Sequence, residues 1–121
     1  MPPNPLPNLS IDTDRLWSTL NRSAEIGVGE AGGLRRVALS DDDKIMRDQF
    51  VGWCKGAGCA VTVDAAGNIF ARRAGREDDL PPVVVGSHLD TQAAGGRFDG
   101  ILGVLSGLEI LRTLADNNIT T

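Results

Sequence analysis

The sequence predicts an α/β fold, and three segments carry this prediction. Val83–Val85 are β-branched residues that follow a double proline, a pattern typical of a short buried strand. Residues 100–115 have the apolar periodicity of a helix, and residues 60–72 alternate as a β-hairpin does. A strand, a polar turn at its carboxyl end and a covering helix form a βα unit. Because ligands bind at that end of the strands in α/β folds, we expect the chemistry in residues 86–100.

The N-terminal region is expected to contain a leader and one helix. Residues 1–10 hold four prolines and predict an irregular leader, so residues 11–121 are expected to be the folded part. Asp12 or Thr13 can cap the helix that follows. Its apolar face repeats at Leu16, Leu20 and Ala24.

A glycine-rich connector, residues 27–39, leads to a second helix. The adjacent arginines of the connector, Arg35 and Arg36, are interpreted as solvated surface, with a site that faces an anion as the less favoured alternative. Ser40 caps the second helix, and Asp41–Asp43 in its first turn suit the positive end of the helix dipole. An apolar stripe marks the buried face of this helix, at Met46, Phe50, Trp53, Cys54 and Ala57.

The C-terminal half is predicted from turn residues and periodicity. Gly67 is expected in the tight turn of the hairpin. Gly103 and Gly107, four residues apart in the last helix, leave room for another backbone to approach closely. Ile119–Thr121 are predicted to begin a further strand. Cys54 and Cys59, the two cysteines, are interpreted as reduced thiols.

Charge and hydropathy exclude several classes of protein. The net charge is −4 at pH 7, and no basic cluster occurs, which argues against nucleic acid or an anionic membrane as a partner. No segment resembles a signal peptide, and no apolar run approaches the length of a membrane span. The sequence therefore predicts a soluble cytoplasmic protein.

His88, Asp90 and Asp99 are the candidate site residues. His88 is the only histidine, and residues two apart in extended backbone point to the same side, so His88 and Asp90 can converge. Imidazole and carboxylate are the ligands that suit a catalytic zinc ion, which favours His88 and Asp99 as ligands. Asp90 would then orient the imidazole as a hydrogen-bond acceptor.

Three other interpretations of these residues stay open at this point. His88 and Asp90 are also compatible with a purely structural hydrogen-bonded pair, and Asp99 with a helix N-cap. A phosphate cradle is the third, since a glycine-rich loop meets a helix N-terminus. The phosphate-loop motif is absent, however, and Asp90 and Asp99 would repel phosphate.

Several motifs together resemble one enzyme family. They are GSHLDT, GGRFDG and ILGVLSGLEILR in residues 86–112, with GGLRRVALSDDDKIMRD and VDAAGNIFAR upstream. The sequence is similar to the zinc-dependent amidohydrolases that include N-carbamoyl-L-amino-acid hydrolase, β-ureidopropionase and allantoate amidohydrolase. These enzymes are relatives of aminoacylase and of the carboxypeptidase-like metallopeptidases. The resemblance covers nearly the whole chain after residue 10.

The resemblance implies a metal-dependent hydrolase. It implies a mixed-sheet catalytic domain with an inserted dimerisation domain, a homodimer, and two divalent metal ions, zinc or alternatively manganese or cobalt. It makes His88 a ligand of one metal, Asp99 the carboxylate that bridges both, and Asp90 the catalytic residue that orients His88. The implied reaction is hydrolysis of the carbamoyl or amide C–N bond of N-carbamoyl-L-amino acids or related ureido acids by metal-activated water, with a glutamate as general base.

The resemblance also implies that part of the enzyme is missing. The family's general base, its other histidine ligands and its substrate-binding residues have no counterpart before Thr121. We therefore expect the N-terminal part of a truncated catalytic domain, inactive by itself and marginally stable. The alternatives are an allantoate amidohydrolase and a non-catalytic fragment.

Overall fold

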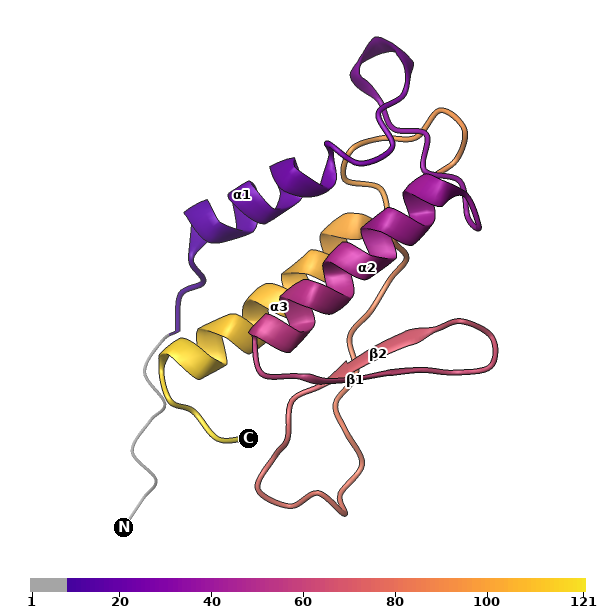
Figure 1. The fold of residues 1–121 in the computed structure, drawn as a ribbon. Helices are drawn as coiled ribbons and strands as arrows, with labels where there is room; N and C mark the ends of the chain where they lie inside the picture. The colour runs from indigo at the N-terminus through magenta and orange to yellow at the C-terminus, as the bar shows by residue number, and fades with distance from the viewer. Residues whose placement is uncertain (1–8) are drawn as a thin grey trace.

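A computed structural model describes residues 9–121, which form three helices, one short 3₁₀ turn and one hairpin (Figure 1). In chain order these are α1 (Thr13–Ser23), η1 (Glu30–Gly32), α2 (Asp41–Gly56), β1 (Ala60–Val63), β2 (Ile69–Arg72) and α3 (Ile101–Asp116). Residues 1–8 of the predicted leader lie outside the described residues, and Leu9 and Ser10 have no regular structure. The α/β class is therefore correct, with the helices in the predicted places.

Side-chain caps fix where the first two helices begin. The Asp12 carboxylate accepts a hydrogen bond from the backbone N–H of Arg15, and the Ser40 hydroxyl accepts one from that of Asp43. Asp43 also accepts from the backbone N–H of Leu39 at 2.9 Å, so its carboxylate stabilises the chain entering α2. The interpretation of the acidic triplet as a helix start is confirmed, since these groups offset unpaired backbone donors.

The predicted hairpin forms. β1 and β2 pair antiparallel, with Ala60 opposite Arg72 and Val63 opposite Ile69. Gly67 has a φ of +89°, a conformation that glycine adopts without strain. Two backbone N–H groups and the Asn68 amide of the turn donate to the Asp64 carboxylate, and these hydrogen bonds, led by that of Asn68, lower the pKa of Asp64.

The core joins all three helices to the hairpin. Its buried members are Leu20, Met46, Phe50, Cys54, Cys59, Leu89, Ile101, Leu105 and Leu108. Both cysteines are free thiols, as predicted. Burial raises the pKa of Cys54 to about 12, so this thiol stays protonated and behaves as a small apolar residue.

The predicted strand Val83–Val85 does not form. The three residues are extended without strand pairing, and their exposed fractions are 101%, 75% and 61%. The only sheet within residues 9–121 is the two-stranded hairpin, so this segment has no strand on either edge. The expectation of burial was wrong because a buried strand needs neighbours that these residues do not supply. Ile119–Thr121 likewise form no strand, although the Thr121 carbonyl accepts from the backbone N–H of Arg76.

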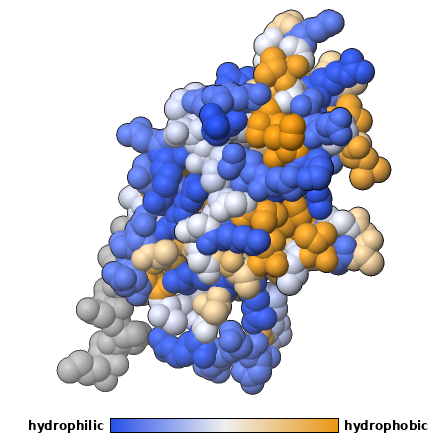
Figure 2. Space-filling view, in the orientation of Figure 1, coloured by the Kyte–Doolittle hydropathy of each residue, from blue (hydrophilic) through white to orange (hydrophobic). Residues whose placement is uncertain are grey.

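The close neighbours of the two glycines of α3 are side chains, not the backbone that their spacing predicted. A Cβ added at Gly103 would lie 3.0 Å from Cβ of Ser87, and one at Gly107 would lie 3.1 Å from a methyl group of Val85. The chain entering the candidate site is therefore packed along one face of α3. Elsewhere, large apolar side chains remain exposed, and Figure 2 shows apolar patches on an otherwise hydrophilic face.

Arg36 is the second correction. Its neighbour Arg35 is exposed as predicted, but Arg36 is completely buried. The connector is extended here, so residue 36 lies on the same side as the buried Leu34. The pair was misread because alternation along an extended segment sends one arginine outward and the other inward.

Candidate functional site

The imidazole of His88 is held in one orientation. Its Nδ1 lies 2.8 Å from the backbone carbonyl oxygen of Asp90 and 3.4 Å from Oδ1 of the same residue. A carbonyl oxygen can only accept a hydrogen bond, so Nδ1 must carry the proton. In the neutral ring, Nε2 then keeps its lone pair. The predicted closeness of His88 and Asp90 is thus observed, with the backbone carbonyl as the nearer acceptor.

Asp99 faces the free nitrogen of His88. Its Oδ1 lies 3.9 Å from Nε2, and both side chains are about half exposed. Asp99 does not cap α3, because the N-cap is Gly100, which offers no side chain. The N-cap interpretation of Asp99 is therefore wrong, and its carboxylate is free to face His88.

Gly100 makes the approach of His88 possible. Its φ of +73° and ψ of −52° are not helical, and a Cβ at this position would overlap the His88 ring. Only glycine combines this backbone conformation with an open α-carbon face. The start of α3 is therefore shaped to receive the imidazole.

The donor set suits a divalent metal ion but supplies only part of a site. Two ligands of one tetrahedral zinc ion lie roughly 3.3 Å apart when each bond is about 2.0–2.1 Å. A small side-chain adjustment would bring Nε2 of His88 and Oδ1 of Asp99 to that spacing. Within residues 9–121, no three His, Cys, Asp or Glu side chains are grouped as a metal site requires. Further ligands would have to come from elsewhere.

The loop between His88 and Asp99 is held by contacts to the connector, residues 27–39, and to α1. Leu34 and Gly95 exchange backbone hydrogen bonds of 2.9 and 2.8 Å, which join the loop to the connector. Phe98 stacks on Trp17 of α1, with ring centroids 5.9 Å apart. The side chain next to Asp99 is therefore held against α1.

Arg36 is the residue near this site that sequence reasoning missed. Its Nε donates to the backbone carbonyl of Leu89 at 2.9 Å, between His88 and Asp90. Its backbone N–H donates to the Thr91 hydroxyl, and its carbonyl accepts from the backbone N–H of Thr91. The usable signal was the alternation with Leu34, which places residue 36 inside.

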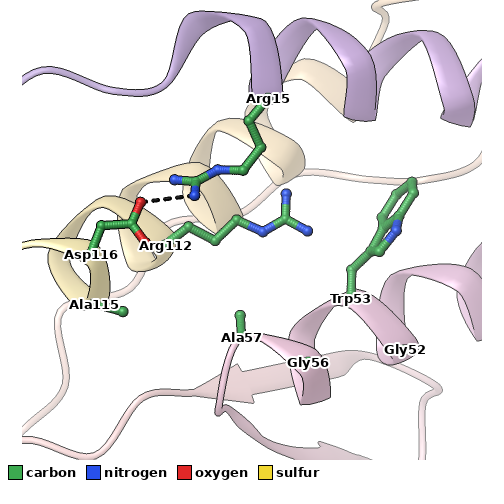
Figure 3. A pocket seen from close by; sticks show the side chains of 8 residues that line it. All are labelled: Arg15, Gly52, Trp53, Gly56, Ala57, Arg112, Ala115 and Asp116. Carbon is green, nitrogen blue, oxygen red and sulfur yellow. Dashed lines mark ion pairs between the residues drawn. The ribbon is translucent and has the colours of Figure 1, made fainter.

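One cavity lies away from the candidate site residues. It has a volume of about 430 Å³ and lies between the three helices, lined by Arg15, Gly52, Trp53, Gly56, Ala57, Arg112, Ala115 and Asp116 (Figure 3). Arg15 pairs with Asp116 at 2.8 Å and with the buried carboxylate of Glu109 at 2.7 Å. The hydrogen bond to Glu109 is the main cause that raises the pKa of Arg15. None of the three candidate site residues lines this cavity.

Comparison with known proteins supports the resemblance seen in the motifs. No family model matches the chain. It is 50% identical over 114 residues to an N-carbamoyl-L-amino-acid amidohydrolase of Rhizobium meliloti, which covers 94% of this chain and 27% of that protein. A crystal structure of a hydantoinase/carbamoylase family amidase from Burkholderia ambifaria is 57% identical, with a TM-score of 0.92 over 93% of this chain and 28% of that one. The predicted resemblance is confirmed.

The chain is thus similar to one part of the carbamoylase-type amidohydrolases. It spans about a quarter of the length of the curated relatives it matches. A ureidoglycolate hydrolase of Oryza sativa is also related, at 36% identity over 86% of this chain and 22% of that protein. The names of these relatives refer to N-carbamoyl-L-amino acids in the first case and to ureidoglycolate in the second. Among residues 9–121, no helix has the length and hydropathy to cross a membrane.

Proposed function

We propose that this chain is the metal-binding N-terminal part of a hydrolase that cleaves the carbamoyl C–N bond of N-carbamoyl-L-amino acids. The observation that carries the proposal is the His88 imidazole, whose Nδ1 is occupied by the Asp90 carbonyl and whose Nε2 faces the Asp99 carboxylate. Similarity to proteins of that name over 92–94% of the chain supports the choice of substrate.

Each residue has a proposed role. His88 would hold a divalent metal ion through Nε2, and the Asp99 carboxylate would be the ligand shared by two such ions. Asp90 accepts a hydrogen bond from the Nδ1–H of His88 and so keeps the lone pair on Nε2. Metal ions bound here would polarise the carbamoyl carbonyl and lower the pKa of a water nucleophile. Zinc is the first choice, with manganese and cobalt as alternatives.

The complete reaction needs more than these residues. A catalytic zinc site has about three protein ligands, and this chain offers two candidates, His88 and Asp99. We therefore propose that residues outside this chain supply the general base, the remaining ligands and the substrate contacts. The homodimer remains a prediction of the family resemblance, and the cytoplasmic location remains a prediction from the sequence.

The test measures metal and turnover separately. Zinc binding is measured by calorimetry on this chain, and ammonia release from N-carbamoyl-L-amino acids is measured on the longest polypeptide that contains it. We expect weak zinc binding by the chain alone, lost in His88→Ala and in Asp99→Asn, and turnover only by the longer polypeptide. Asp48→Asn, on an exposed side chain of α2, is the control and should bind zinc like the wild type. Unchanged zinc binding in both site variants would refute the ligand assignment.

A second substrate class has its own support. The plant relatives are named ureidoglycolate hydrolases, so ureidoglycolate is assayed beside the N-carbamoyl amino acids, together with allantoate. A preference for either ureido acid would keep the chemistry and change the substrate. No turnover of any of the three by a metal-loaded longer polypeptide would favour a non-catalytic role.

A further inference from the structure

We propose that Arg36 is a positioning residue that fixes the tautomer of His88 by holding the peptide group to which the imidazole is bound. This inference rests on the proposed function for its importance, because the tautomer decides which nitrogen can bind a metal. It concerns a residue outside the candidate ligands. Three features of Arg36 carry it: its burial, its contacts to residues 89–91, and its tie to α1.

The first step is a continuous chain of hydrogen bonds. The backbone N–H of Thr91 and the carbonyl of Asp90 belong to one planar peptide group and point in opposite directions. That N–H donates to the Arg36 carbonyl at 2.7 Å, while the Asp90 carbonyl accepts from Nδ1 of His88 at 2.8 Å. Arg36 and His88 therefore bind opposite edges of the same peptide, and each bond polarises the other.

The second step concerns the peptide group before it. Nε of Arg36 donates to the Leu89 carbonyl at 2.9 Å, and the Thr91 hydroxyl accepts from the Arg36 backbone N–H at 2.8 Å. Both peptide groups that flank the α-carbon of Asp90 are thereby held by one residue. The Asp90 carbonyl cannot turn away from His88 without breaking these bonds.

The third step explains what holds Arg36 itself. Its Nη1 donates to the carbonyls of Ser23 and Ile26 at 3.0 and 2.7 Å, at the end of α1. Burial lowers its pKa, and the charges of Asp43, Asp42 and Asp90 oppose that effect. A guanidinium group stays protonated even so, and its rigid fork serves α1 and the site at once. A lysine ammonium has one nitrogen and cannot reach both sets of carbonyls.

The test uses the fact that His88 is the only histidine. In ¹⁵N-labelled chain without metal, above the pH at which imidazole titrates, the two ring nitrogens give an unambiguous pair of shifts. Wild type is expected to show the proton on Nδ1. Arg36→Lys is expected to move a measurable fraction of the proton to Nε2, whereas the exposed neighbour variant Arg35→Lys leaves the shifts unchanged.

Thr91→Val is the second variant, since it keeps the shape of the side chain and removes the hydroxyl that accepts from the Arg36 backbone N–H, together with its hydrogen bond to the Gln92 carbonyl. It decides the matter if Arg36→Lys does not fold, as judged by circular dichroism. A shift of the proton toward Nε2 in a folded variant supports the proposal. Wild-type nitrogen shifts in the folded Arg36→Lys chain, or in Thr91→Val when Arg36→Lys is unfolded, overturn it.

Zinc titration separates this inference from the proposed function. If His88 binds metal through Nε2, Arg36→Lys is expected to weaken zinc binding about 10-fold, the lower end of the effect of outer contacts on metal sites. A tautomer shift with zinc binding unaffected even in His88→Ala would leave the positioning role intact and refute the metal site. An unshifted tautomer with zinc binding lost in His88→Ala would do the reverse.

Discussion

The strand Ala60–Val63 and the segment Val83–Val85 are both short and rich in β-branched residues, yet only the first is hydrogen-bonded to a partner strand. Ala60–Val63 pairs with a strand that begins six residues further along the chain. Among residues 9–121, Val83–Val85 has no strand on either edge. A methyl group of Val85 packs against Gly107 of α3, whereas Val83 and Val84 lie in solvent. Side-chain type gives a tendency to extend, and a partner strand decides whether a sheet forms.

The test with the largest expected effect compares a substitution in the core with one in the segment Val83–Val85. Leu105→Ala removes a buried side chain of α3 and is expected to lower the free energy of unfolding by about 2–5 kcal/mol. Val84→Ala should change it by less than about 0.5 kcal/mol, because the side chain is exposed. Urea unfolding followed by tryptophan fluorescence measures both. Equal losses would mean that Val84 is covered in solution.

The next test concerns the packing of the His88 ring against Gly100, at the start of α3. Gly100→Ala forces a side chain into a strained φ and into the His88 ring, so we expect a loss of about 1–3 kcal/mol together with displaced imidazole resonances. Gly52→Ala is the matched control, since a Cβ added at this position of α2 would meet no other atom. This substitution should raise the free energy of unfolding by about 0.5–1 kcal/mol. Unmoved His88 resonances in Gly100→Ala would contradict the packing described here.

The core also contains a group that responds to alkaline pH. The pKa of Cys54 is raised from 9.0 to about 12 by burial, so the unfolded chain ionises first. Its contribution to stability is complete below pH 9 and is lost as the pH rises toward 12. The urea midpoint should fall over that range, and less so in Cys54→Val. A midpoint that falls equally in both chains would show that Cys54 is not the cause.

The smallest change in stability is expected at the exposed edge. Val84→Lys should leave the urea midpoint within error, because the residue is already in solvent. It should, however, reduce any concentration-dependent association of the chain, since charged residues block edge-to-edge pairing. Sedimentation at two concentrations measures this, with Lys55→Val, at an exposed position of α2, as a comparison that keeps the edge intact. Association that persists in Val84→Lys would place the contact on another surface.

Local signals predicted most of the fold. Helices α1 and α2 follow from Asp12 and Ser40 as caps, and the hairpin follows from Gly67, because these effects act within a few residues of sequence. The strands predicted at Val83–Val85 and at residues 119–121 were wrong, because a sheet depends on partner strands that local sequence patterns do not contain. The closeness of His88 and Asp90 came from strand geometry.

The rest of the site required three-dimensional information. The separation of Asp99 from His88 depends on Gly100, whose unusual φ has no unique sequence signature. The hydrogen bonds from Arg36 to Leu89 and Thr91 join residues more than 50 positions apart. Adjacent arginines are most often solvated. Only the alternation with the buried Leu34 distinguishes Arg36, which lies on the same side of the connector, from the exposed Arg35.

The stacking of Trp17 on Phe98 gives the chain a built-in optical reporter. Phe98 precedes the candidate ligand Asp99, and the partly exposed indole is sensitive to any change in that contact. In a Trp53→Phe chain, Trp17 is the only indole, so its emission follows the position of the loop alone. Titration of ions or carbamoyl compounds could then be read by fluorescence at micromolar protein, with no label near the site.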